Sequence, residues 1–174
     1  MTGWFDGMAE ARRRIAEEAA RRTGRLDLRN LGLAALPEEL FVLTHLRELD
    51  LGALWRWEPG HRPNAIDTQR AGVGRLTALE RLSLAWSDLT HLDFVRSLSA
   101  LGALDCSGTG VADLAPLAGL TALQALDCPN GIVKLTGFGA RLITRQHCGD
   151  VYAAIWAQVS CRHTRKASAR ARRY

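Results

Sequence analysis

Histidine and cysteine side chains near the C-terminus are the residues of this chain whose types most directly suggest chemistry. His147 and Cys148 are adjacent, and Cys161 and His163 are two residues apart, so four potential zinc ligands fall within 17 residues. Neither spacing lets two ligands from one turn reach a tetrahedral metal comfortably. We therefore predict no metal site and interpret these four residues as part of a C-terminal tail.

No other combination of residues predicts catalysis. The five histidines are scattered along the chain, and no serine or cysteine lies in a nucleophile motif. The phosphate-binding pattern G-x-x-x-x-G-K-[ST] is also missing from the sequence. We predict that the protein is not an enzyme and that it uses no cofactor.

The net charge of +5 is concentrated at the C-terminus. Residues 162–174 hold six Arg or Lys side chains and no acidic ones, so residues 1–161 carry a net charge of −1. Terminal basic runs are usually solvated, so we expect nucleic-acid binding only if this tail provides it. The N-terminus has no secretory signal and no apolar run is long enough to cross a membrane. These features favour a cytoplasmic protein with reduced cysteines.

The elements that would position binding residues are predicted by a repeated pattern, L-x-x-L-x-L. Four copies begin at Leu46, Leu79, Leu101 and Leu123, and an incomplete first copy begins at Leu26. Equivalent leucines are separated by 23, 33, 22 and 22 residues. Both ends of each L-x-L point to one side of a short strand, and only stacking of the copies about 4.8 Å apart buries that side. The pattern predicts a parallel sheet with a continuous interior.

Over roughly residues 23–130 the chain resembles the leucine-rich-repeat proteins. The resemblance implies an α/β repeat fold, a short solenoid whose parallel strands line its concave face. We assign residues 23–133 to a solenoid of about five repeats. A second wall is expected on the return path between strands, which also carries two prolines where no sheet hydrogen bond is needed. Its residues are Leu36, Pro37, Leu40, Leu43, Leu92, Leu98, Leu114, Pro116, Leu117 and Leu120.

Residues 1–22 form the predicted N-terminal cap of the solenoid. The segment 5–22 reads as a helix with Asp6 at its start. Its apolar residues, Phe5, Met8, Ile15 and Ala19, lie near one face, and charged residues cover the rest. Because terminal repeats need a polar outer cover, we interpret this helix as a lid over the open end of the sheet.

Two columns of the repeat allow finer predictions. Cys106 and Cys128 take the last leucine position in adjacent copies, and we interpret them as buried thiols that replace leucine. The ninth position of such repeats usually holds a small polar residue that bonds the backbone of the turn. Here it is occupied by Leu31, Leu54, Ser87, Thr109 and Gly131. Only Ser87 and Thr109 fit well, so the other turns are expected to be irregular.

Candidate binding residues lie between the core leucines, where side chains face outward on the concave side. They form a column of Asp27, Asp50, Ser83, Asp105 and Asp127. Like charges on neighbouring strands cost up to about 1 kcal/mol each in water, and a partner presenting Lys or Arg would relieve that cost. The alternative is that Leu-Asp-Leu is simply a common strand sequence in repeats of this type and has no role in binding. Asp50, Asp105 and Asp127 are kept as candidate partner-binding residues.

The long second interval is a further candidate interface. Its surplus falls within residues 55–74, which contain Trp55, Arg56, Trp57 and Arg62. Insertions in solenoids map to loops on one face, often the binding face, and exposed Trp and Arg dominate interface energetics. Trp86, in the next copy, is expected to lie near this loop. The alternative is that the tryptophans fold back and fill the gap that the insertion makes.

The repeat pattern fails in residues 134–174. Gly137–Ala140 can be encoded so that the adjacent reading frame gives Asp-Leu-Ala-Pro, the tetrapeptide found at 113–116. One hypothesis is that the chain past about Lys134 is read out of frame or comes from a truncated gene. The alternative is a natural C-terminal cap in which residues 151–159 form a covering helix.

The amino-acid sequence of the repeats permits comparison with a narrower group of leucine-rich-repeat proteins. The unit SGTGVADLAPLAGLTALQALDC is similar to repeats of bacterial cytoplasmic Roco-type proteins, in which the solenoid precedes a GTPase module. Because the phosphate-binding loop is missing, only the solenoid part of that comparison carries over. We predict a non-catalytic module that binds a protein partner through its concave face and the 55–74 loop. The alternative is a truncated regulatory repeat region of a Roco-like signalling GTPase.

Overall fold

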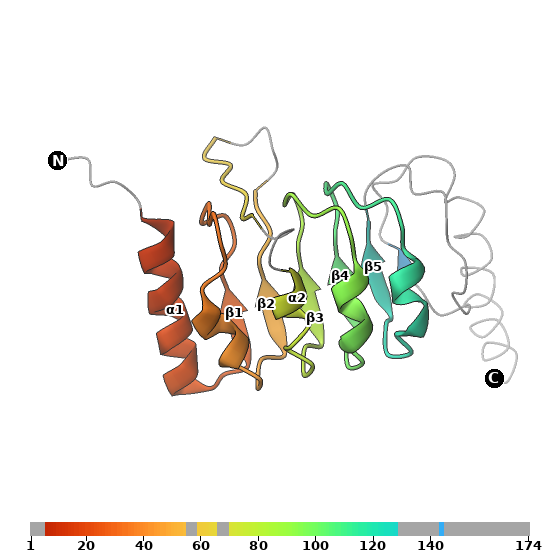
Figure 1. The fold of residues 1–174 in the computed structure, drawn as a ribbon, viewed down its shortest axis with the longest axis horizontal. Helices are drawn as coiled ribbons and strands as arrows, with labels where there is room; N and C mark the ends of the chain where they lie inside the picture. Colours follow the sequence, from red (N-terminus) through yellow and green to blue (C-terminus); the bar gives the residue numbers. More distant parts are fainter. Residues whose placement is uncertain (1–5, 55–58, 66–69, 129–142, 145–174) are drawn as a thin grey trace, which may run out of the picture.

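The computed structural model describes residues 6–54, 59–65, 70–128 and 143–144. Its strands form one parallel sheet and follow one another in chain order. Figure 1 shows them side by side, with helical return segments as a second layer and a helix at the N-terminal end. The strands are β1 (Arg25–Asp27), β2 (Glu48–Asp50), β3 (Arg81–Ser83), β4 (Ala103–Asp105), β5 (Ala125–Asp127) and β6 (Ile143–Thr144).

The register of the sheet follows the leucine pattern. Leu26, Leu49, Leu82, Leu104 and Leu126 are paired from each strand to the next and are all buried. Backbone hydrogen bonds continue one residue past the strands, as in Leu28 N to Asp50 O at 2.8 Å. The 33-residue interval leaves this register unbroken, so the surplus residues loop out of the sheet. The predicted repeat architecture is confirmed.

Short helical turns form the second wall of the core. They are η1 (Glu38–Val42), α2 (Arg70–Val73), η2 (Asp93–Ser97) and η3 (Ala115–Gly119). The leucines predicted for this wall are all buried, with at most 6% of each side chain exposed. Pro37 precedes η1 and Pro116 lies in η3, both away from the sheet ladder, as predicted. Helix α2 contacts both η1 and η2 and so continues the second wall. Arg70–Val73 therefore belong to the return segment of this repeat, not to the insertion.

The N-terminal helix α1 (Gly7–Arg21) begins where the sequence predicts. The Asp6 carboxylate accepts hydrogen bonds from Met8 N at 3.0 Å and Ala9 N at 3.1 Å, which satisfies two of the free amides of the first turn. The buried face consists of Ala11, Ile15 and Glu18, with Met8 packed beside it. Ala19, expected on this face, is exposed instead. The prediction for Ala19 was wrong because Glu18, one position earlier, turns inward.

Glu18 joins the cap to the solenoid. Its carboxylate is 4% exposed and accepts hydrogen bonds from Gly24 N at 2.7 Å and from the Thr23 backbone and hydroxyl. His45 Nε2 lies 3.0 Å from its Oε1. Burial raises the pKa of Glu18, but these hydrogen bonds outweigh burial and the net effect lowers it. A buried charge with this many donors holds α1 in one position against the first strand.

The sheet extends beyond the recognisable repeats. In β6, Ile143 and Thr144 pair in parallel with Ala125 and Leu126 of β5. These two residues lie within the segment 134–174, where the leucine pattern has failed. Among residues 6–54, 59–65 and 70–128, no helix is long and apolar enough to cross a bilayer.

Candidate interaction surface

The outward-facing residues of β1 to β5 line an open groove of about 850 Å³ on the concave side of the sheet. The strand register places one residue of each strand in a first column and another in a second column, with a buried leucine between them. The first column is Arg25, Glu48, Arg81, Ala103 and Ala125. The second is the predicted column of Asp27, Asp50, Ser83, Asp105 and Asp127. We call this surface the concave groove.

In the first column, Glu48 on β2 is paired with arginines on both neighbouring strands. Glu48 Oε1 lies 3.3 Å from Arg25 Nη2 and 3.2 Å from Arg81 Nη1. One carboxylate therefore bridges two guanidinium groups on the neighbouring strands. Exposed pairs of this kind contribute little to stability. The two arginines and one glutamate leave a net charge of +1 in this part of the first column.

The second column is also compensated over β1 and β2. Arg29 Nη2 lies 3.6 Å from Asp27 Oδ2, and Arg29 Nη1 lies 3.9 Å from Asp50 Oδ2. The like-charge cost expected between Asp27 and Asp50 is thus partly relieved within the chain. Burial raises the pKa of Asp50, against the lowering effect of its hydrogen bond from Gly52 N at 3.0 Å and of nearby Arg29.

Over β4 and β5 the groove has a different character. Asp105 accepts hydrogen bonds from Ser107 N at 3.0 Å and Ser107 Oγ at 2.7 Å, and no Arg, Lys or His of the described chain pairs with it. The first column here is Ala103 and Ala125, and both aspartates are partly buried. The groove is therefore lined by ion pairs over β1 to β3 and by two alanines and two aspartates over β4 and β5.

The second part of the insertion is folded onto the first turn of the solenoid. Asn30 Oδ1 accepts from Arg62 N at 2.7 Å, and Asn30 Nδ2 donates to Gly60 O at 2.9 Å. Two backbone bonds add to this contact, Gly32 N to Arg62 O at 3.1 Å and Ala65 N to Leu33 O at 2.7 Å. Residues 59–65 are thus an ordered extension of the first turn.

Asn64 is the centre of this contact, and sequence reasoning missed it. Its side chain is completely buried, accepts from Leu33 N at 3.0 Å, and donates to Leu28 O at 2.8 Å and Leu51 O at 3.0 Å. The first two repeats have leucine at their ninth positions, and Asn64 supplies the polar group that these turns lack. The signal available in the sequence was an asparagine within an insertion that follows two turns without a polar residue at the ninth position.

In later repeats the ninth position works as predicted. Ser87 Oγ donates to Leu84 O at 2.7 Å and Thr109 Oγ1 donates to Cys106 O at 2.6 Å. Each hydroxyl bonds a carbonyl three residues earlier, at the end of its strand. The polar group that closes these turns is local, whereas Asn64 reaches across 36 residues to Leu28.

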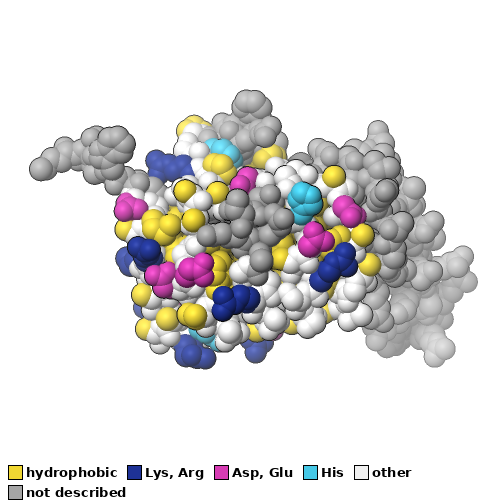
Figure 2. Space-filling view, in the orientation of Figure 1, with side chains coloured by type: hydrophobic (Ala, Val, Ile, Leu, Met, Phe, Trp, Pro, Cys, Tyr) yellow, Lys and Arg dark blue, Asp and Glu magenta, His cyan; other side chains and the backbone are white. Residues whose placement is uncertain are grey.

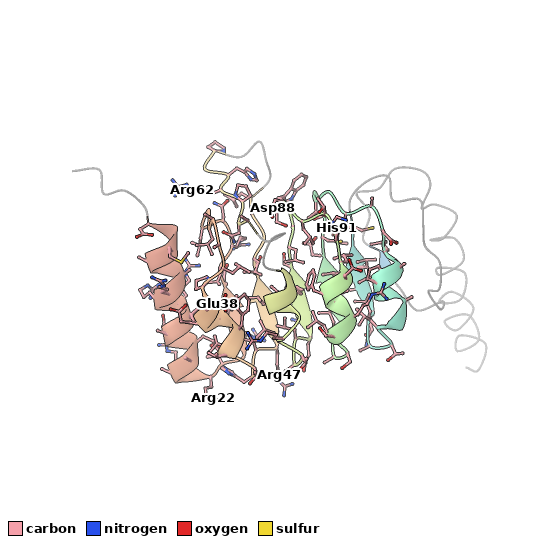
Figure 3. All side chains as sticks on the ribbon, viewed as in Figure 1. Arg22, Glu38, Arg47, Arg62, Asp88 and His91 are labelled. Carbon is pink, nitrogen blue, oxygen red and sulfur yellow. The ribbon has the colours of Figure 1, made fainter. Side chains whose placement is uncertain are left out.

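Of the predicted loop residues, only Arg62 and Trp86 lie in the described chain. Arg62 is exposed. In Figure 3 it lies near the top of the molecule, as Asp88 does, whereas Arg22 and Arg47 lie near the bottom. Trp86 has a left-handed backbone with φ of 59° and packs against Gly108 in the next turn. Trp55, Arg56 and Trp57 fall outside the described residues, as do the tail positions His147, Cys148, Cys161 and His163.

Cys106 and Cys128 are buried free thiols, as predicted. Cys106 Sγ donates to Asp127 O at 3.2 Å. The pKa of Cys106 is raised well above its ordinary value. Burial is the largest cause, and the neighbouring Cys128, Asp105 and Asp127 add to it. A protonated, enclosed thiol is a core side chain rather than a nucleophile. In the described part of the chain, no three His, Cys, Asp or Glu residues gather as metal ligands would.

The described residues of the opposite face carry a mixture of side-chain types. Figure 2 shows the side of the return segments, where basic and acidic side chains are interspersed and apolar ones are scattered between them. Val42, on η1, is 68% exposed, and no other large apolar residue of the described chain except Leu54 is exposed. The concave groove is therefore the best-formed binding surface that the described residues provide.

Solved proteins share this fold. A leucine-rich-repeat protein from Leptospira interrogans is 21% identical, and the match covers 82% of this chain and 40% of that one with a TM-score of 0.50. Internalin C2 from Listeria monocytogenes is 22% identical over 70% of this chain and 51% of its own, with a TM-score of 0.49. This chain thus spans about half or less of these proteins. No protein-family model and no curated protein sequence matches it.

The stacked parallel strands, the leucine register and the N-terminal helix define a short leucine-rich-repeat solenoid. The structural matches do not extend the narrower resemblance to Roco-type proteins. The fold alone is common to the chain and its structural neighbours, so function has to be argued from the groove and the insertion.

Proposed function

We propose that this protein is a non-catalytic protein-interaction module that binds its partner through the concave groove and the 55–74 loop. The observation that supports this proposal is the concave groove itself, a continuous outward-facing sheet surface across five strands. Solenoids use such extended concave surfaces to bind other macromolecules. Absence of a catalytic constellation from the sequence is consistent with this role.

The loop contributes because the chain is anchored on both sides of Trp55, Arg56 and Trp57. Asn30 and Asn64 hold residues 59–65 against the first turn, and Ala53 N bonds Ala85 O at 2.7 Å on the other side. Trp55, Arg56 and Trp57 follow Ala53 and Leu54 in the sequence, between these two attachments. A recognition loop with fixed ends loses less conformational entropy when it binds, so this anchoring favours presentation of the tryptophans to a partner.

The test compares loop and core substitutions in the intact chain. Pull-down from cells of the source organism identifies a partner, and its affinity is then measured for each variant. Trp55→Ala and Trp57→Ala are expected to lose the partner with the thermal midpoint nearly unchanged. Leu104→Ala, which empties a core position that is 2% exposed, is expected to destabilise the fold by about 2–5 kcal/mol. A large fall in midpoint for the Trp variants would place the rings in the core and defeat the loop's role.

A second candidate function follows from the repeat sequence of residues 107–128. The chain would be the repeat region of a Roco-like signalling GTPase, in a bacterial cytoplasm, from a gene truncated or frame-shifted past about Lys134. This candidate predicts further leucine-rich copies in an adjacent reading frame and a phosphate-binding loop downstream. Reading the nucleotide sequence tests both expectations, and a gene without them removes the candidate.

A further inference from the structure

The chain before residues 55–58 is tied to the chain after them through the backbone of Leu54. Leu54 O lies 2.7 Å from Nδ1 of His61, and because a carbonyl oxygen only accepts, this ring nitrogen carries the proton. Leu54 N donates a longer hydrogen bond, of 3.4 Å, to Asn30 Oδ1. Both backbone polar groups of Leu54 are therefore bonded, one to the far end of the insertion and one to the first turn of the solenoid.

Asn30 is the residue that contacts both ends. In addition to Leu54 N, its Oδ1 accepts from Arg62 N at 2.7 Å, and its Nδ2 donates to Gly60 O at 2.9 Å. One amide side chain thus bonds the backbone immediately before residues 55–58 and the backbone shortly after them. Joining two points of a chain in this way removes conformations from the segment between them.

The turn that contains Asn30 does not itself need an asparagine. Asn30 has a positive φ of 58° and follows the strand residue Leu26 by four positions, as Gly108, with φ of 66°, follows Leu104. Glycine thus forms the equivalent turn of a later repeat. Asn30 is also only partly buried, whereas Asn64 is completely buried and bonds the first two turns. The contacts of the Asn30 amide therefore serve the insertion more than the core.

We propose that Asn30 is a positioning residue for partner binding: its amide joins the two ends of residues 55–58 and so limits how this segment meets a partner. His61 is the second tie across the same base. The inference rests on the proposed function, because it names the residue that prepares that same loop for binding. A segment with fewer conformations to lose binds more tightly, so Asn30 raises affinity without contacting the partner.

Trypsin tests the tie in the full chain without the partner. Between Leu54 and Asn64 trypsin can cut only after Arg56, because the bond after Arg62 precedes proline. Cleavage of a folded protein requires local opening, so its rate reports how firmly the two ends are joined. Asn30→Gly removes the amide and suits the positive φ. We expect cleavage after Arg56, followed by mass spectrometry, to become about tenfold faster, the effect of losing one or two net hydrogen bonds.

Two controls separate positioning from a general loss of stability. The bond after Arg81 lies in β3 and is cut only when the sheet opens, so its cleavage rate in the same digest and the thermal midpoint should stay near the parent values. Asn30→Asp keeps an acceptor for Arg62 N and should recover part of the protection at Arg56. Unchanged cleavage after Arg56 in Asn30→Gly, or an equal rise after Arg81, overturns the proposal.

Partner affinity completes the test, with the protein captured by pull-down as the probe. Asn30→Gly is expected to weaken its binding about three- to tenfold at an unchanged thermal midpoint, and Asn30→Asp should weaken it less. Faster cleavage after Arg56 with unchanged affinity overturns the positioning role. If Trp55→Ala loses the partner and Asn30→Gly does not, only the role of Asn30 fails. If Trp55→Ala retains the partner, the loop's part in the proposed function fails, whatever the cleavage rate.

Discussion

Replacing Asn64 tests whether the insertion completes the first two turns of the solenoid. The Asn64 side chain makes three hydrogen bonds and is completely buried. Asn64→Ala leaves Leu33 N, Leu28 O and Leu51 O without this partner. Each buried polar group left unsatisfied costs about 1–3 kcal/mol. We expect the free energy of unfolding to fall by about 3 kcal/mol or more, since local relaxation and entry of water offset part of the sum.

Two further variants separate the causes of that loss. Asn64→Leu fills the space but restores no hydrogen bond, so it should be nearly as destabilising as Asn64→Ala. Ser87→Ala is the matched control, because Ser87 closes the turn of a later repeat with a single bond to Leu84 O. Its expected cost is about 1 kcal/mol.

Urea denaturation followed by circular dichroism measures these differences. The midpoint for Asn64→Ala should fall well below that for Ser87→Ala, with the denaturant slope unchanged. If Asn64→Ala costs no more than Ser87→Ala, the three bonds do not stabilise the fold and residues 59–65 are not an essential part of the first turns. Retained stability would also weaken the view that the loop is presented from a fixed anchor.

Two other predictions concern the cap and a tight turn. Glu18→Gln should destabilise the fold by about 1–3 kcal/mol at pH 7. Because the folded state lowers the pKa of Glu18 from 4.5, its stabilisation is present above pH 4.5 and is lost as pH falls below it, so thermal midpoints of variant and parent should converge in acid. Gly108→Ala should cost about 1–3 kcal/mol, because φ is +66° and the added methyl group would meet the Trp86 ring. Gly119→Ala has open space around it and should be nearly neutral in the same measurement, and equal effects at both glycines would contradict the Trp86 contact.

The fold could be predicted because the same pattern of strand leucines recurs in five copies. Leu49, Leu82, Leu104 and their equivalents recur every 22 or 23 residues except across the insertion, where the interval is 33, and each copy packs against its neighbours. The aspartate column followed directly from that register. Its compensation by Arg29 did not, because the pairing depends on where a long side chain turns after the strand.

The features that escaped prediction are polar groups satisfied by distant parts of the chain. Asn64 bonds carbonyls and amides of residues 13 to 36 positions away, and no periodic pattern connects them. Glu18 sits one position from the predicted apolar residue Ala19, and its charge argued for an exposed position. Only the nearby donors of Thr23, Gly24 and His45 make its burial favourable.

The polar bonds of Glu18 and Asn64 also bear on how the solenoid opens. In a repeat protein each unit contacts only its neighbours, and local opening can begin at an end. Here Glu18 links α1 to His45, beyond the first strand, and Asn64 links the first turn to Leu51 of the second. The cap and the first two repeats are therefore expected to open together. In hydrogen exchange, the amides of Gly24, Leu28 and Leu33 should share one opening free energy.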